Sequence, residues 1–253
     1  MKSQFSLFLL LVLALIFSAA KSQSSISDSV LNATLMTVHY AYHFPAGDLD
    51  DRFGSNSAMG FEITFKMKKN WLMGPGAGFL FGNKVKEDDI LDKITTPEGF
   101  LITNSGKLSE FQLQERGFSL DWQVGKIIPV FGPNPNSGLR ISAGFGFIQH
   151  KIRIETEFED ARQLTNDAKK GYDRLTNGGM LKQFIGYSHL AENKLLNFYI
   201  GFEAIQAFTQ NRRDWDFSTN SKLDAKRTDI FYGLKLGWMI PAYRQATEKF
   251  YYY

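Results

Sequence analysis

The sequence predicts an all-β protein, an antiparallel transmembrane β-barrel of about eight strands with long extracellular loops. Three observations favour this fold class. Several segments alternate apolar and polar residues with a period of two, which turns one face toward lipid and the other toward a lumen. Beyond the first apolar run, no stretch approaches the roughly 20 apolar residues that a spanning helix needs. The connections between the segments alternate between short and long, as expected of strands that cross a bilayer in turn.

The first residues are typical of a secretory signal peptide. A short charged start precedes an apolar run from Phe5 to Phe17, and small residues follow it. The run has about 13 residues, which is too short for a spanning helix, so a retained membrane anchor is the less favoured alternative. We expect cleavage after Ala20 or after Ser22 and export to the bacterial outer membrane.

The composition excludes several classes of protein. The chain contains no cysteine, which excludes an N-terminal lipid-bearing cysteine, disulfide bonds and thiolate sites. The formal charge of +3 falls to about +1 without the two lysines of the leader, so no nucleic-acid partner is predicted. The 22 glycines and the high aromatic content fit strands that carry aromatic belts and leave room inside a narrow barrel.

The alternation is clearest between Phe118 and Val124, where every second residue is apolar and Ser119, Asp121 and Gln123 lie between. A helix would repeat its apolar residues at a period near 3.6 instead. Seven other segments follow the same pattern, two of them more weakly. The eight predicted strands are residues 36–44, 59–67, 71–81, 118–124, 139–147, 181–187, 198–204 and 232–238.

The connections give the predicted orientation, because short turns lie on the periplasmic side of such barrels. We expect the short turns near residues 68–70, 129–137 and 191–194, and the long loops near 45–57, 83–116, 151–178 and 209–228. Two further features concern these loops. Residues 100–103 and 111–113 form a plausible hairpin around Asn104 to Gly106. The alternation also continues from His150 to Glu157, which suggests a strand that runs beyond the bilayer.

The chain divides into four expected parts within one folded domain. These are a cleaved signal peptide (1–22), a short periplasmic segment (23–33), the barrel (34–240) and a periplasmic aromatic tail (241–253). Pro241 cannot donate a backbone hydrogen bond and forbids continued pairing on one side, so we expect the last strand to end near Ile240. The tail is either an anchor at the membrane interface or an assembly signal, or else it is a peptide for a periplasmic partner.

Charged residues recur on the predicted inner face. Eight strands leave an interior just wide enough for side chains to fill, so these charges should pair with one another or with trapped water. A proton or ion path is the alternative, whereas a wide pore would need some sixteen strands. The predicted lumen charge network consists of Glu62, Lys66, Asp121, Arg140, Lys182, Glu203 and Lys235.

Histidines and acidic residues suggest no metal site. His39 and His43 share one face of a strand but lie about 13 Å apart along it, which is too far for one ion. The aspartates at Asp48, Asp50 and Asp51 lack the remaining ligands of a calcium loop. We therefore predict no metal and no cofactor.

An enzymatic reading has little support from the residues. We expect His150 to lie near the outer rim and Ser119 and Asp121 to point inward, but these residues do not form a set of nucleophile, base and orienting group. His189 is expected near the opposite end of the barrel. We predict no catalytic residue and no enzyme.

Large aromatic residues in otherwise polar segments are candidate contacts for partners. For the aromatic residues in the loops, an equally supported alternative is that they pack the loops onto one another as a cap. The candidates are Phe100, Phe111, Tyr172, Trp215, Phe217, Phe250, Tyr251, Tyr252 and Tyr253.

The sequence resembles a family of small outer-membrane β-barrel proteins common in Bacteroidota, themselves similar to barrels of the OmpA and OmpX type. The segments that carry the likeness are PAGDLDDRFGSNSAMG (45–60), NWLMGPGAGFLFGNKVKEDDIL (70–91), ERGF (115–118), SGLRISAGFGFIQHKIRIE (137–155), KKGYDRLTNG (169–178), NFYIGFEAIQAFTQNRR (197–213) and YGLKLGWMIPAYR (232–244). The family offers no catalytic residues to transfer. Some members look like accessory subunits of larger outer-membrane machines for barrel assembly or protein secretion.

The resemblance and the residues together favour a non-enzymatic accessory or structural subunit of an outer-membrane complex. We expect it to contact outer-membrane lipid and to bind proteins of the outer membrane or periplasm through its loops and tail. A free-standing structural or adhesion barrel is one alternative. A small lipid-modifying enzyme of the outer membrane is the other.

Overall fold

The computed structural model describes residues 30–157, 164–191 and 196–243. The predicted signal peptide, most of the predicted segment 23–33 and the last ten residues of the predicted tail lie outside these ranges. Phe250, Tyr251, Tyr252 and Tyr253 are therefore outside the described residues.

The described chain folds into a closed barrel in which eight strands pair antiparallel in the order β1-β10-β9-β8-β7-β6-β3-β2. All eight predicted strands are present, and the predicted fold class is confirmed. Closure pairs the first strand with the last, because Ala33 lies opposite Tyr243. The barrel strands are β1 (Ala33–Gly47), β2 (Asn56–Lys66), β3 (Trp71–Gly82), β6 (Phe111–Ile128), β7 (Gly138–Thr156), β8 (Thr176–His189), β9 (Phe198–Asn211) and β10 (Lys226–Tyr243).

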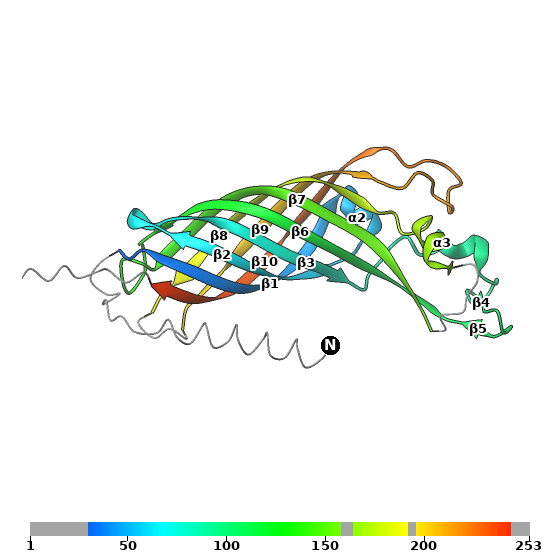
Figure 1. Cartoon of the computed structure of the whole chain (residues 1–253), viewed down its shortest axis with the longest axis horizontal. Helices are drawn as coiled ribbons and strands as arrows, with labels where there is room; N and C mark the ends of the chain where they lie inside the picture. Colours follow the sequence, from blue (N-terminus) through cyan, green and yellow to red (C-terminus); the bar gives the residue numbers. More distant parts are fainter. Residues whose placement is uncertain (1–29, 158–163, 192–195, 244–253) are drawn as a thin grey trace, which may run out of the picture.

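Two ends of the barrel differ in their connections (Figure 1). The turn end carries the short connections β2–β3, β6–β7 and β8–β9, and the loop end carries the long ones. Short helices and a small hairpin lie in these connections. They are α2 (Asp48–Arg52), η1 (Lys68–Asn70), η2 (Asp88–Ile94), β4 (Leu101–Ile102), β5 (Leu108–Ser109) and α3 (Asn166–Lys170). Within the described ranges, no helix is long and apolar enough to cross a membrane.

The strands are longer than the alternation predicts. β6 has 18 residues and β7 has 19, whereas a tilted strand needs about 9–11 residues to cross hydrocarbon. The continued alternation after His150 does belong to a strand, because β7 runs to Thr156. The long loops are correspondingly shorter than expected, since paired backbone continues well above the part that faces lipid.

The predicted hairpin in the second loop is correct in its first strand only. Leu101 pairs with Ser109 and Ile102 pairs with Leu108 across the turn. Phe111 instead begins the barrel strand β6, because its partner is Thr156 of β7.

The last strand continues three residues beyond the expected end at Ile240. Pro241 lies opposite Leu35 of β1, and the pairing runs on to Tyr243. On the other side, pairing of β10 with β9 ends at Trp238. Proline is tolerated here because only one neighbouring strand is paired at this point.

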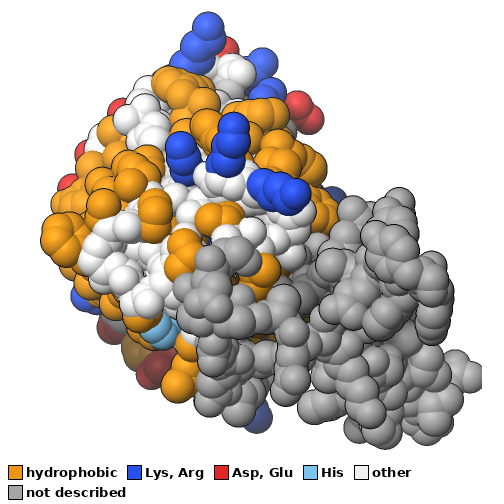
Figure 2. Space-filling model, turned by 90° about the vertical axis from the view of Figure 1, so that its left-hand side faces the viewer, with side chains coloured by type: hydrophobic (Ala, Val, Ile, Leu, Met, Phe, Trp, Pro, Cys, Tyr) orange, Lys and Arg blue, Asp and Glu red, His pale blue; other side chains and the backbone are white. Residues whose placement is uncertain are grey.

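The outer face of the barrel is apolar. Phe118, Leu120, Trp122 and Val124 of β6 are all exposed, as the alternation predicts. Figure 2 looks onto the turn end and shows hydrophobic side chains around much of the described rim, with several lysine and arginine side chains among them. Exposed apolar surface of this extent would be unfavourable in water and is stable against lipid chains.

The interior consists of three layers. At the turn end lies an apolar cluster of Ala33, Leu35, Leu72, Ile127, Phe184, Leu190, Tyr199 and Met239. At the loop end lies a larger apolar cluster to which strands and loop segments both contribute. Buried charged residues, described below, occupy the middle of the barrel.

Glycine on the inner face makes room for aromatic rings. A Cβ atom on Gly237 would lie 2.3 Å from Cζ of Tyr199, so only glycine fits beside this ring. Likewise, a Cβ atom on Gly186 or Gly201 would lie 2.8 Å from Cζ of Phe184. Close packing of this kind leaves little empty space in an eight-stranded barrel.

Candidate functional site

The middle of the barrel holds a layer of paired charges, here called the charge layer. Lys235 donates from Nζ to Glu62 and to Glu203, at 2.7 Å each. Lys182 donates to Asp121 at 2.6 Å and lies 3.9 Å from Glu203. These five side chains come from β2, β6, β8, β9 and β10 and are all buried. The layer therefore connects strands on opposite sides of the barrel.

Arg140 completes the charge balance of this layer. Its Nη2 atom lies 3.6 Å from Oε2 of Glu62, and its guanidinium group lies 4.3 Å from the ring centroid of Tyr199. The hydroxyl of Tyr199 donates to the same carboxylate oxygen at 3.1 Å. Three bases, Arg140, Lys182 and Lys235, thus face three acids, Glu62, Asp121 and Glu203. Such pairing offsets the cost of burying charge.

Polar side chains fill the remaining positions around the carboxylates. Gln123 donates from Nε2 to Asp121 at 2.7 Å and to Glu62 at 3.2 Å. His43 contacts Glu203 through Nε2 at 3.2 Å, and Nδ1 of His39 lies 3.7 Å from Glu62. The two histidines therefore serve different carboxylates. Within the described ranges, no group of three or more His, Asp or Glu residues could hold a metal ion.

Lys66 is the one predicted member of the network that lies apart from the charge layer. Its ammonium group donates to Oδ1 of Asn136 at 2.7 Å and to the carbonyl oxygen of Leu31 at 2.9 Å, near the turn end. It lies at the end of β2, four residues beyond Glu62, so the same inner face carries it to a different level of the barrel. The alternation along a strand predicts which face of the barrel a side chain lies on, but it does not predict the height in the barrel at which the partner of that side chain lies.

The loop end is closed by a folded unit, here called the cap, which comprises the described residues of the connections 48–55, 83–110, 164–175 and 212–225. Its apolar side chains continue the inner cluster of the barrel strands. Seven of them are buried: Leu49, Phe53, Ile90, Leu91, Leu101, Leu164 and Tyr172. The cap is thus packed into the barrel mouth by the hydrophobic effect.

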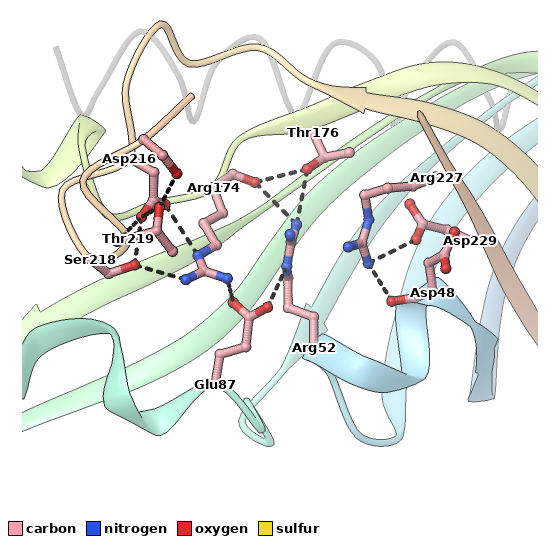
Figure 3. A network of polar contacts seen from close by, with 11 residues as sticks. Asp48, Arg52, Glu87, Arg174, Thr176, Asp216, Ser218, Thr219, Arg227 and Asp229 are labelled. Atoms are coloured by element: carbon pink, nitrogen blue, oxygen red, sulfur yellow. Dashed lines mark hydrogen bonds and ion pairs between the residues drawn. The ribbon is translucent and has the colours of Figure 1, made fainter. Parts of the chain in front are cut away.

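Arginine residues join the separate connections of the cap (Figure 3). Arg52 of α2 donates to Oγ1 of Thr176 at 3.0 Å and to Glu87 at 3.4 Å. Arg174 lies 2.5 Å from the other oxygen of Glu87 and 3.3 Å from Asp216. Through these contacts, side chains from all four long connections form one network.

Arg52 is almost fully buried beneath this network. Burial and the neighbouring Arg227 lower the pKa of Arg52 from its ordinary value, and Glu87 partly opposes this effect. Removal of the partners of Arg52 would therefore leave a buried charge without compensation, which costs several kcal/mol.

Asp216 is the acid of the fourth connection. Burial alone would raise the pKa of its carboxyl group, but hydrogen bonds from Ser218 and Thr219 and the charge of Arg174 lower it below the usual value. The carboxylate accepts from the Ser218 hydroxyl at 2.5 Å and from the Thr219 backbone at 2.9 Å. These bonds hold the connection 212–225 in its folded form.

His150, which the sequence places near the outer rim, is fully buried below the cap. Its Nε2 atom lies 3.0 Å from Oδ2 of Asp229, and the Thr209 hydroxyl donates to the same oxygen at 2.5 Å. The imidazole also packs edge-on against Phe53 and against Phe231. The contacts of His150 therefore support the barrel mouth, and they do not include Ser119 or Asp121.

The candidate partner contacts of the loops divide into two groups. Tyr172 is buried and packs edge-on against Phe217, so its ring is part of the cap. Phe111 is partly buried against the apolar cluster at the loop end, and Phe100 is also partly buried. Trp215 and Phe217 remain exposed, at 47% and 43%.

Two further apolar side chains of the cap are exposed that sequence reasoning did not select. Ile102 and Leu108 lie opposite one another in the β4–β5 hairpin and are 46% and 55% exposed. The selection considered only aromatic residues, so these aliphatic residues were missed. Exposed apolar groups in a loop region commonly mark contact surfaces.

The fold and the buried layers define the class: this is an eight-stranded transmembrane-type β-barrel with a filled interior and a folded cap at one end. No protein-family model matches the sequence, and no curated protein matches it.

Solved structures of similar shape are outer-membrane proteins of low sequence identity. The attachment invasion locus protein Ail of Yersinia pestis is 9% identical, with a TM-score of 0.40, over 83% of this chain and 98% of that one. Neisserial surface protein A is 8% identical, with a TM-score of 0.39, over 82% and 96%. The outer membrane protein OprG of Pseudomonas aeruginosa is 11% identical, with a TM-score of 0.34, over 86% and 99%.

Proposed function

We propose that this protein is a non-enzymatic accessory subunit of a larger protein complex in the bacterial outer membrane. In this proposal the barrel is the membrane anchor, the turn end faces the periplasm, and the cap faces outward and binds a protein partner. We also propose that it belongs to the Bacteroidota family of small barrels that its sequence resembles.

The observation that carries the proposal is the filled interior. The charge layer lies between two apolar clusters, and the cap residues Leu49 and Phe53 are fully buried in the mouth. A barrel built in this way offers its outer face and its ends for function. The outer face is apolar and suits lipid, so the ends remain for partners.

The cap favours a protein partner. Its four connections are joined by Arg52, Arg174 and their acids, so it presents an ordered surface. The exposed side chains of Trp215, Ile102 and Leu108 lie on that surface. Tryptophan is enriched at the centres of protein interfaces, and the two aliphatic side chains add apolar area beside it. Because an ordered surface loses little entropy on binding, it suits stable association.

Affinity purification of the tagged protein from its own membranes in mild detergent tests the proposal. We expect a stoichiometric assembly in which a photoreactive amino acid at position 215 crosslinks to a defined protein. The change Trp215→Ala, combined with Ile102→Ser and Leu108→Ser, should release the assembly. Phe202→Ala is the matched control, because Phe202 is exposed on the outer face of the barrel.

A second variant that lacks residues 247–253 tests the expected role of the tail at the periplasmic side. Release of one partner by this deletion and of another by the cap variant would assign separate contacts to the two ends. A clean monomer in which position 215 crosslinks to no protein would contradict the proposal and favour a free-standing barrel.

A further inference from the structure

The upper part of β7 is paired on one side only within the described ranges. Its pairing with β6 continues to the last residue, where Thr156 lies opposite Phe111. Its pairing with β8 ends at His150, opposite Thr176. Residues 151–156 therefore form a strand edge that projects above the closed part of the barrel.

The direction of the backbone groups along this edge follows from two hydrogen bonds. The N–H of Ile152 donates to the carbonyl of Asp173 at 2.8 Å, on the side of β8. The N–H of Glu157 donates to the carbonyl of Glu110 at 3.1 Å, on the side of β6. Since alternate residues of an antiparallel strand direct their backbone groups to the same side, Ile154 and Thr156 turn theirs away from β6.

Within the described ranges, these groups are available to a partner. Among the described parts of the chain, no strand pairs with Ile154 or Thr156 on the side away from β6. The side chains of Ile152 and Ile154 are buried in the apolar cluster of the loop end, which holds the edge in place. An ordered edge with free donors and acceptors is a template for strand addition.

A cleft runs along the edge, on the side where a further strand would lie. It has a volume of about 500 Å³, within the roughly 300–1,000 Å³ usual for ligand sites. The edge forms one wall, and α3 and nearby loop residues form the other. Beyond the bond of Ile152 to Asp173, the edge extends about 10 Å from Arg153 to Thr156, which matches about three residues of an added strand. The lining residues are Lys151, Ile152, Arg153, Ile154, Glu155, Thr156, Lys169, Lys170, Asp173 and Arg213.

The charge of the cleft indicates the charge of the ligand that it would bind. Its lining contains five basic and two acidic residues. Both acids are already paired, Glu155 with Arg153 at 2.6 Å, and Asp173 with Arg213 at 2.5 Å and with Lys151 at 3.6 Å. Lys170 is paired with Asp167, at 2.8 Å, so the net positive charge is smaller than the lining alone suggests. The remaining positive charge favours an acidic ligand.

We propose that the free edge of β7 binds an extended acidic peptide segment of a protein partner by β-strand addition. Ile154 and Thr156 supply the backbone hydrogen bonds, and Lys169 attracts an acidic side chain. This inference rests on the proposed function and names the kind of segment that the partner contributes. A sulfated polysaccharide would also meet the positive charge, but it would not use the aligned backbone groups.

The test uses the whole barrel in detergent micelles and a fluorescent eight-residue peptide of alternating Glu and Val. We expect saturable binding and, with a carbonyl-labelled peptide, an infrared shift to intermolecular β-sheet. Thr156→Pro removes the N–H that faces the cleft, which an edge strand tolerates, and should weaken binding by about tenfold or more. Thr156→Ala keeps that N–H and should bind like the original protein.

Charge is tested separately. Lys169→Glu should weaken binding several-fold, whereas Lys222→Glu places the same change in another connection of the cap and should have no effect. A peptide of alternating Lys and Val should not bind. Equal migration of all variants as folded barrels in electrophoresis without heating controls for misfolding.

Two outcomes would overturn the inference. If Thr156→Pro binds the acidic peptide as tightly as Thr156→Ala, the cleft recognises charge alone, as it would for dextran sulfate. If the peptide does not bind at all while the native assembly still forms, the strand-addition inference fails and the proposed function stands. Loss of the native assembly itself would instead remove the proposed function.

Discussion

The ammonium group of Lys182 lies 2.6 Å from Oδ1 of Asp121 inside the barrel, and the two side chains are 5% and 1% exposed. Neither group has access to bulk water, so each depends on the other for compensation of its charge. Removal of one partner of such a pair commonly costs about 3–5 kcal/mol.

We therefore expect Lys182→Met to lower the free energy of unfolding by about 3–5 kcal/mol. Asp121→Asn should cost a similar amount, and the double variant should cost clearly less than the sum of the two, since no charge is left unpaired. Urea unfolding followed by electrophoresis without heating measures these values. Additive costs would contradict direct coupling. Lys222→Met, at an exposed position, serves as the control for loss of a lysine.

Gly237 offers a test of packing inside the barrel. Gly237→Ala would place a Cβ atom 2.3 Å from Cζ of Tyr199 and so displace the ring from Glu62. We expect a loss of about 1–3 kcal/mol in unfolding free energy, as for other overpacked cores. Gly179→Ala is the matched control, because its Cβ atom would meet nothing closer than 4.0 Å. Tyr199→Leu should relieve part of the effect of Gly237→Ala, and equal losses at both glycines would argue against the steric cause.

Asp216 should make the stability of the cap depend on pH. Its pKa is lower in the folded protein than the ordinary value of 3.8, so its contribution is present above that pH and is lost as the pH falls through the folded pKa. At pH 7, Asp216→Asn should speed hydrogen exchange in the connection 212–225. Below about pH 3.8 the difference between the variant and the original protein should shrink. A difference that persists unchanged at pH 2 would show that ionisation of Asp216 is not responsible.

We expect the stability of the cap to depend far more on Arg52 than on the other ion pair of α2, between Asp50 and Lys86. Arg52→Ala removes the bonds to Thr176 and Glu87, and we expect proteases to cleave residues 48–55 much faster while the barrel stays folded. Lys86→Ala removes an exposed pair with Asp50 and should have little effect, because surface pairs contribute about 0–1 kcal/mol. If residues 48–55 resist proteolysis equally well in both variants, the central role of Arg52 is contradicted.

The number of strands and their faces were predictable from the sequence because a barrel strand repeats every two residues. Glu62, Asp121 and Glu203 could be placed on the inner face with no knowledge of their neighbours. The pairing partners could not, since they depend on how far each strand slides along the next. Lys66 therefore appeared to belong to the same network as Glu62, although its partner is Asn136.

The cap was much less predictable. Its residues lack a repeating pattern, and contacts such as Arg174 with Glu87 and Asp216 join connections far apart in the chain. The partners of His150 could not be predicted for the same reason, because Asp229 lies 79 residues away in the sequence.

By itself, the sequence determined that this chain forms an antiparallel barrel with an apolar exterior and charged residues inside, because alternation is a local property of each strand. The tertiary structure alone decided which charges pair, how the mouth is closed and how far β7 extends beyond its pairing with β8. These features arise from register and unequal strand length, which are properties of neighbouring strands together and leave no mark within any one of them.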